Sequence, residues 1–141
     1  MKLIVYTDGG SRNNPGPSGA GAVVRNEGGD VLACAKMFLG VMTNNQAEYT
    51  AVILGLETAK KVAGGKIKAK QTSIEVRLDS ELIARQLADK YQIKEESLFP
   101  LYIKVHNMRI ADFKNITFTH IPREKNKEAD RLANEAMDEA N

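Results

Sequence analysis

Four carboxylates in this sequence could act together: Asp8, Glu48, Asp79 and Asp130. Each is expected at the end of a strand or near the start of a helix, where a rigid scaffold aims side chains into one crevice. Several converging carboxylates repel one another and require a cation. Because oxygen ligands without clustered Cys or His favour hard divalent ions, the pattern points to Mg²⁺ or Mn²⁺ rather than Zn²⁺.

Each carboxylate also has a purely structural explanation. Asp8 is a common turn residue type, and Asp79 could cap the helix that follows it. Glu48 and Asp130 would interact favourably with the dipoles at the N-terminal ends of their helices. The set of four favours a functional site, because a central strand ending at Asp8 would bring its carboxylate beside buried surface, where an unpaired charge is costly.

The apolar pattern predicts the elements that would position these side chains. Short apolar or alternating runs indicate strands, which we expect at residues 3–7, 20–25, 31–39, 73–79 and 115–120. Helices are expected at residues 43–62, 80–90, 98–110 and 127–140. This order predicts an α/β fold with a mixed five-stranded sheet, three antiparallel strands followed by two parallel ones, and helices on both faces.

Four residues carry local expectations. Thr43 and Gln46 fit a capping box, in which the Thr side chain caps the helix and the Gln side chain reaches back to the Thr backbone. Asn126 is the expected N-cap of the last helix. Cys34 lies within an expected strand, so it is interpreted as a small core residue.

Length and composition limit the class of protein. A chain of 141 residues is typical of one domain, predicted here over residues 1–141. Its net charge of +2 means that a polyanion would be held by local groups rather than by overall charge. A single cysteine excludes an internal disulfide framework and a Cys-rich zinc site. Without a signal peptide or a membrane-spanning stretch, we expect a cytoplasmic monomer.

Four segments resemble, in order, the motifs of type 1 ribonuclease H. Residues 7–11 (TDGGS) together with 14–19 (NPGPSG), and residues 43–49 (TNNQAEY), look like its first two motifs. Residues 79–80 (DS) and 126–130 (NKEAD) match the third and fourth. The resemblance covers nearly the whole chain and keeps the family's order of elements. It implies a ribonuclease H-like fold.

The resemblance also implies an activity, which is cleavage of the RNA strand of RNA–DNA hybrids with two divalent ions. Mg²⁺ is the expected metal and Mn²⁺ its substitute, and the products would carry a 5′-phosphate and a 3′-hydroxyl. Asp8 would bridge both ions, and Asp130 would help to hold the ion that activates water. Glu48 and Asp79 would help to hold the ion that stabilises the leaving oxygen.

Polar residues near the first two motifs are the candidates for substrate contacts. By resemblance, the residues that would contact the hybrid are Asn14, Thr43, Asn44, Asn45 and Gln46. Thr43 and Asn14 resemble a pocket that grips a phosphate of the DNA strand. The RNA strand must be distinguished by its 2′-hydroxyls, which polar groups in the minor groove can read.

Two segments depart from the family pattern. Many bacterial members place a histidine in a longer loop before the last helix, but His120 here continues the fifth strand, so we favour Arg123 as the residue that assists catalysis. Some relatives carry a basic, Trp-rich protrusion in the region equivalent to residues 90–110. This chain has no Trp and mixed charges there, so we expect the protrusion to be absent.

Two alternatives stay open. One is a non-catalytic module that keeps the fold and binds hybrid or double-stranded RNA, although four carboxylates would repel a phosphate backbone. The other is a broader nuclease that also cleaves double-stranded RNA, because a protein that reads 2′-hydroxyls could accept RNA in both strands.

Overall fold

A five-stranded sheet forms the centre of the computed structural model, which describes residues 1–140 apart from the Lys66 side chain. The sheet has the order β3-β2-β1-β4-β5, with bounds β1 Lys2–Ser11, β2 Gly16–Asn26, β3 Val31–Met42, β4 Ser73–Leu78 and β5 Asn115–His120. The helices are α1 Asn44–Ala63, α2 Lys66–Ala69, α3 Glu81–Leu87, α4 Phe99–Ala111 and α5 Lys127–Glu139. Two short 3₁₀ turns are η1 Glu96–Leu98 and η2 Arg123–Lys125.

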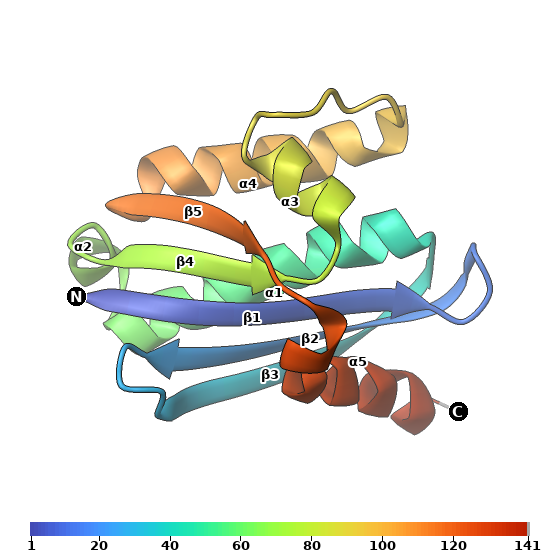
Figure 1. The fold of residues 1–141 in the computed structure, drawn as a ribbon, viewed down its shortest axis with the longest axis horizontal. Helices are drawn as coiled ribbons and strands as arrows, with labels where there is room; N and C mark the ends of the chain where they lie inside the picture. Colours follow the sequence, from blue (N-terminus) through green and yellow to red (C-terminus); the bar gives the residue numbers. More distant parts are fainter. Residues whose placement is uncertain (141) are drawn as a thin grey trace.

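The strand directions confirm the predicted α/β fold. β2 pairs antiparallel with both β1 and β3, whereas β4 lies parallel to β1 and β5 parallel to β4. β1 is therefore the central strand, with an antiparallel neighbour on one side and a parallel neighbour on the other. The carboxyl ends of β1 and β4 point to the same edge of the sheet (Figure 1).

Helices cover both faces of the sheet, as predicted (Figure 1). Gly21 and Ala22 are neighbours in β2, so they face opposite sides of the sheet. A Cβ on Gly21 would lie 2.3 Å from the Ala129 carbonyl oxygen of α5. A Cβ on Gly55 of α1 would lie 3.6 Å from the Cβ of Ala22. Thus α5 packs on one face of the sheet and α1 on the other.

The main hydrophobic core lies on the α1 face. The largest buried contributions come from strands β1 and β4 and from α1, α3 and α4, including Val5, Val76, Leu78, Tyr49, Leu56, Ile83, Leu87, Val105 and Met108. On the other face α5 buries a stripe of Ala129, Leu132, Ala133, Ala136 and Met137. Each fully buried aliphatic side chain of this kind contributes about 1.5–3 kcal/mol, so both layers hold the sheet firmly.

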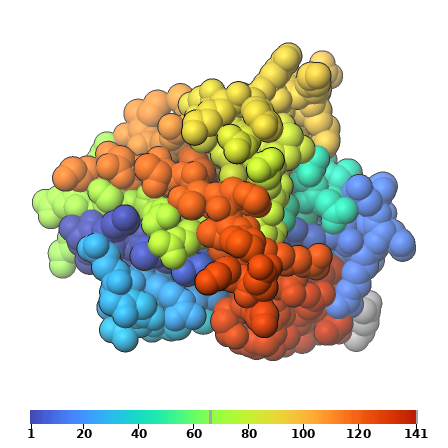
Figure 2. Space-filling model, viewed as in Figure 1, coloured from blue at the N-terminus to red at the C-terminus, as the bar shows by residue number. Residues whose placement is uncertain are grey.

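Only part of the α5 face is covered by a helix. In the space-filling view α5, in red, lies over the half of the sheet formed by β2 and β3, while β4 and β5, in green and orange, reach the surface (Figure 2).

No helix within residues 1–140 is long and apolar enough to cross a membrane.

The capping box is confirmed, the interpretation of Cys34 was wrong, and the prediction for Asn126 is confirmed in position only. Thr43 Oγ1 accepts a hydrogen bond from the Gln46 backbone, and the Thr43 backbone N–H donates to Gln46 Oε1. Cys34 is exposed, because it lies on the edge strand β3 and faces away from the core. Asn126 holds the N-cap position of α5, yet its side chain makes no capping hydrogen bond.

The observed element bounds differ from the expected ones mainly where glycines are frequent. β1 and β2 extend beyond the strands expected at 3–7 and 20–25 into the Gly-rich segment between them, because the glycines at 9, 10 and 19 pair within the antiparallel ladder. The helix expected at 80–90 ends at Leu87, and residues 123–125, where no element was expected, form the 3₁₀ turn η2. Helix α2 has only four residues and was not predicted.

Candidate active site

Asp8 and Asp79 meet at the edge of the sheet where β4 ends. Asp8 does not end its strand as expected, because β1 continues to Ser11. The parallel register pairs Tyr6 with Arg77, and two further residues along each strand bring the chain to the two carboxylates. Asp8 pairs with Gly21 inside the β1–β2 ladder, so it is not a turn residue. Ser80, not Asp79, caps α3, since Ser80 Oγ accepts a hydrogen bond from the Ile83 backbone. Neither carboxylate is therefore used for local structure.

Glu48 joins this pair because β1 and α1 approach each other closely at Gly9. A Cβ on Gly9 would lie 2.1 Å from the Ala47 carbonyl oxygen, so only glycine allows this contact. Glu48 lies beyond the first turn of α1 and is only 8% exposed, which argues against a simple dipole interaction at the helix end. Its Oε2 atom is buried without a hydrogen-bond partner.

Asp130 reaches the same place from α5, on the opposite face from α1. The absence of a side chain at Gly21 lets the first turn of α5 contact β2 directly, at the position paired with Asp8. Asp130 lies in that first turn and makes a side-chain hydrogen bond with Asp8. Two glycines on neighbouring strands thus allow two helices to bring carboxylates to Asp8 from opposite sides.

The four carboxylates line one open cleft of about 460 Å³. One oxygen from each of Asp8, Glu48 and Asp79 lies within 4.8 Å of the others. The remaining lining residues include the polar side chains Ser11, Arg12, Asn44, Asn45, Ser80, Arg123 and Asn134. The structure therefore brings together all four carboxylates that the sequence singled out.

Burial and mutual repulsion disfavour the charged forms of this cluster. Burial is the largest cause that raises the pKa of Asp8, to about 8, followed by the charge of Asp79 and the interactions with Asp130. The charge of Arg123 opposes this rise. Burial also raises the pKa of Glu48 well above its usual value, together with the charges of Asp8 and Asp79. Such a cluster is unfavourable unless protons or cations neutralise it.

These residues fit divalent metal ions. All the ligand atoms are carboxylate oxygens, which suit hard ions such as Mg²⁺ and Mn²⁺. The unpartnered Oε2 of Glu48 is an acceptor with no donor from the protein. A cation would satisfy this oxygen and remove the repulsion that raises the pKa values.

Asn126 is a positioning residue that sequence reasoning interpreted only as a cap. Its side chain is almost fully buried, and its Nδ2 donates a 2.8 Å hydrogen bond to the Thr7 carbonyl oxygen. The same Nδ2 lies 3.5 Å from Asp79 Oδ2. Asn126 thereby connects the start of α5 with the ends of β1 and β4. The only signal in the sequence was its place in the motif that ends at Asp130.

The two basic candidates for catalysis lie in different places. Arg123, at the start of η2, lines the cleft, and its charge acts on Asp8. His120 ends β5, where its Nδ1 lies 3.9 Å from the Glu81 carboxylate of α3, and it does not line the cleft.

The five candidate substrate residues surround the start of α1. Asn44 and Asn45 line the cleft, whereas Asn14, Thr43 and Gln46 do not. Asn14 Oδ1 accepts a hydrogen bond from the Asn44 backbone, so the β1–β2 loop is attached to the helix. Asn45 Nδ2 lies 3.4 Å from Glu95 Oε1. Thr43 and Gln46 form the capping box and fix the backbone at this point.

This sheet order, with one carboxylate within β1 and another just after β4, defines the class of ribonuclease H-like α/β domains. The chain belongs to the type 1 ribonuclease H family: the profile described as reverse transcriptase-like matches residues 6–136. An RNase H1 isolated from compost by a metagenomic approach has 45% identity and a TM-score of 0.91, covering 99% of this chain and 97% of that one. The same relative has been solved in complex with an RNA/DNA hybrid, with 42% identity, a TM-score of 0.89 and 98% of each chain covered.

Two further relatives are longer proteins. A bifunctional protein of Mycobacterium tuberculosis is 40% identical over 141 residues, which cover 99% of this chain and 36% of that protein. Ribonuclease HI of Halobacterium salinarum is 37% identical over 139 residues, which cover 99% of this chain and 66% of that protein. This chain therefore spans about a third of one relative and just under two thirds of the other.

Proposed function

We propose that this chain is a metal-dependent endoribonuclease that hydrolyses the RNA strand of RNA–DNA hybrids. The observation that carries the proposal is the convergence of Asp8, Glu48 and Asp79 within 4.8 Å of one another, in an open cleft that Asp130 also lines. A relative bound to an RNA/DNA hybrid, at 42% identity, supports the choice of substrate. The expected products carry a 5′-phosphate and a 3′-hydroxyl.

Two Mg²⁺ ions, or Mn²⁺ in their place, would supply the Lewis acidity that stabilises the attacking and leaving oxygens of an in-line displacement. Asp8, at the centre of the cluster, is the residue that would contact both ions. Asp130 would hold the ion beside the attacking water, while Glu48 and Asp79 would hold the ion beside the leaving oxygen. Arg123, the basic side chain nearest Asp8, would assist at the reacting phosphate.

Substrate selection would come from the polar surface around the start of α1. Asn44 and Asn45 lie on the cleft, and the residues behind them, Asn14, Thr43 and Gln46, hold the backbone of that corner in place. Polar groups there can read the 2′-hydroxyls that distinguish RNA from DNA. Asn14 and Thr43 would contact a phosphate of the DNA strand.

The described residues share one sheet, with helices packed on both faces, which supports a single catalytic domain over residues 1–141. A monomeric state and a cytoplasmic location remain predictions. Sedimentation of the purified protein and fractionation of its host cells would test them.

A cleavage panel tests the proposed function. An end-labelled RNA–DNA hybrid is compared with double-stranded RNA, double-stranded DNA and single-stranded RNA, each with Mg²⁺, with Mn²⁺ and with a chelator. Asp8→Asn is the control, because it removes the central charge and keeps the side-chain shape. We expect metal-dependent cutting of the RNA strand of the hybrid, lost in the variant.

The other arms of the panel decide between the alternatives. Metal-dependent cutting of double-stranded RNA would extend the activity to a broader nuclease. Hybrid binding without cutting under either metal would replace the proposed enzyme with a binding module. Cutting that persists in chelator or in Asp8→Asn would refute the carboxylate mechanism.

A further inference from the structure

An arginine that the sequence analysis left unassigned lies on the rim of the carboxylate cleft. Arg12 follows β1 in the loop that leads to β2, and its side chain lines the cleft together with Asn134 of α5. Only two cationic side chains, Arg12 and Arg123, line this cleft within the described part of the chain. The charge of Arg123 acts on Asp8. Arg12 instead lies beside Asp138, near the C-terminal end of α5.

The loop that carries Arg12 is fixed at both ends. The Arg12 backbone N–H donates a 2.8 Å hydrogen bond to the Pro17 carbonyl oxygen. On the helix side, Ser11 N–H donates to Asn44 Oδ1 and Asn44 N–H donates to Asn14 Oδ1. The backbone of Arg12 is therefore held beside the cleft, so its side chain needs little ordering to act there.

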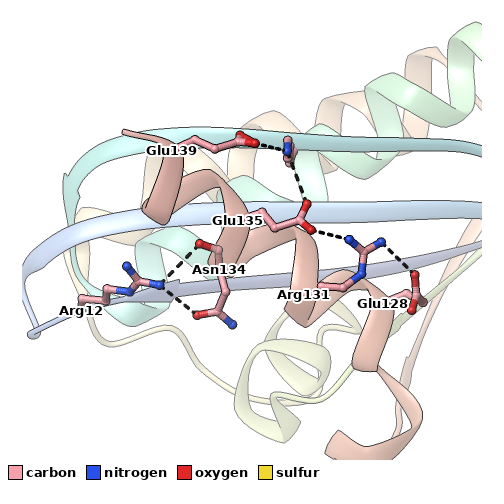
Figure 3. A network of polar contacts seen from close by, with 7 residues as sticks. Arg12, Glu128, Arg131, Asn134, Glu135 and Glu139 are labelled. Atoms are coloured by element: carbon pink, nitrogen blue, oxygen red, sulfur yellow. Dashed lines mark hydrogen bonds and ion pairs between the residues drawn. The ribbon is translucent and has the colours of Figure 1, made fainter. Parts of the chain in front are cut away.

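The Arg12 guanidinium forms an ion pair that is exposed to solvent. Its Nη2 lies 2.7 Å from Asp138 Oδ1. The same Nη2 lies 3.4 Å from the backbone oxygen and 3.5 Å from the side-chain oxygen of Asn134 (Figure 3). The side chain of Arg12 is 42% exposed and that of Asp138 is 65% exposed. An ion pair this exposed contributes little to stability, so Arg12 can leave Asp138 for another anion at low cost.

The neighbouring charges on α5 are already paired with each other. Arg131 bonds Glu128 and Glu135, and Lys36 of β3 bonds Glu135 and Glu139 (Figure 3). None of these five residues lines the cleft. Arg12 is thus the member of this surface network that is available to a ligand in the cleft.

The position of Arg12 suits a phosphate a short way from the one that is cut. Asn134 and Asp138 lie four and eight residues after Asp130, which is about 6 and 12 Å along α5. For a strand that runs alongside α5 with an axial rise of about 3.4 Å per nucleotide, this corresponds to about two to three nucleotides. A guanidinium is suited to bind such a phosphate through two parallel N–H bonds.

We propose that Arg12 binds a backbone phosphate of the strand being cut, two to three nucleotides from the scissile phosphate, and that Asp138 holds Arg12 when no substrate is bound. This inference rests on the proposed function. Arg12 is then a substrate-binding residue that the four motifs do not contain, and Asp138 competes with the substrate for it.

Two variants that break the same ion pair test this assignment. Arg12→Ala removes the phosphate contact, so we expect KM for the hybrid to rise about 3- to 10-fold with kcat within twofold. The slope of log KM against log salt should decrease by about 0.9, the value for one lost phosphate contact. Asp138→Asn removes the competing charge, so KM should fall. Arg131→Ala, which removes an arginine from the same network outside the cleft, should leave KM within twofold.

The direction of these effects separates binding from a structural role. If the pair only fastens the loop to α5, Arg12→Ala and Asp138→Asn will raise KM together, and this outcome would overturn the inference. An Arg12→Ala enzyme indistinguishable from Arg131→Ala in KM and in salt slope would also overturn it, while leaving the proposed function intact.

The proposed function can fail separately. If the wild type binds the hybrid without cutting it, Kd values of the uncut hybrid replace KM in the same comparison, with the same expected directions. A wild type that neither cuts nor binds the hybrid would refute both proposals.

Discussion

Asp8 shows how one residue links stability to function. Its raised folded pKa, about 8 against 3.8 in the unfolded chain, means that between these values the folded state binds a proton that the unfolded state has lost. Stability without metal therefore decreases as pH rises through this window, and Glu48 acts in the same direction. From pH 5.5 to 7.5 we expect a loss of about 1–3 kcal/mol in the free energy of unfolding.

Urea titrations in chelator at several pH values measure this loss. Asp8→Asn removes the central charge, so it should be more stable than the wild type at pH 7.5. Its stability should depend less on pH than that of the wild type, and the remaining dependence should come from the buried Glu48. Mg²⁺ should stabilise the wild type and have much less effect on the variant, since ligand binding to the folded state adds to its stability. A wild type whose stability in chelator is flat from pH 5.5 to 7.5 would contradict the electrostatic description of the cleft.

Arg123 and His120 give a second prediction for single residues. Arg123 lines the cleft and acts on Asp8, so Arg123→Ala should lose most of the turnover, on the order of 10-fold or more. His120 lies beside Glu81, away from the cleft, so His120→Ala should keep near-full turnover. Measurement of kcat at saturating hybrid compares the two, and the reverse order of effects would reject Arg123 as the assisting residue.

At the scale of elements, the site depends on how closely helices approach β1 and β2. Gly21→Ala would place a Cβ 2.3 Å from the Ala129 carbonyl oxygen and push α5, with Asp130, away from Asp8. We expect a destabilisation of about 1–3 kcal/mol and a much larger proportional loss of cleavage. Gly10→Ala is the matched control, because its nearest contact would be Asn44 Oδ1 at 4.0 Å.

Thermal unfolding and initial rates of both glycine variants separate the two effects. Cleavage rates are compared at temperatures well below the unfolding midpoint of each variant, so that unfolded protein does not lower them. If Gly21→Ala cuts the hybrid as fast as Gly10→Ala does, then the approach of α5 to β2 does not set the position of Asp130.

The elements also show what a sequence can predict. The capping box at Thr43 and the five strands depend on local patterns that one segment contains, and the structure confirms them. The Cys34 side chain was misplaced because an edge strand has an exposed face that its own sequence does not mark. Asn126 was interpreted as a cap, because its partners Thr7 and Asp79 come from strands distant in the chain.

The residues of the candidate site could be predicted from the sequence, but the distances between them could not. The four carboxylates stood out by their places at element ends, and the structure gathers them in one cleft. Their separations depend on two glycines that set helix–sheet contacts, which no single segment reveals. Arg12 was missed because its role arises from α5, more than a hundred residues later in the chain.

At the scale of the whole molecule, the cleft proposed to receive the hybrid has few cationic groups around it. The loop between α3 and η1 contains no helix, and it carries charges of both signs at Asp89, Lys90, Lys94 and Glu95. The Trp-rich protrusion that some relatives carry in this region is therefore absent from the described residues. Around the four carboxylates, only Arg12 and Arg123 offer positive charge.

Affinity should accordingly be low and governed by a small number of phosphate contacts. With about two to three phosphates neutralised, the affinity for the hybrid should fall about 10- to 40-fold when salt rises from 50 to 200 mM. KM measured over this range, beside a relative that carries the protrusion, tests the expectation: the relative should bind more tightly at every salt concentration and show the steeper slope. Equal affinity at moderate salt would mean that another surface of this chain replaces the protrusion, and the lysines of the α3–η1 loop would then be the first to substitute.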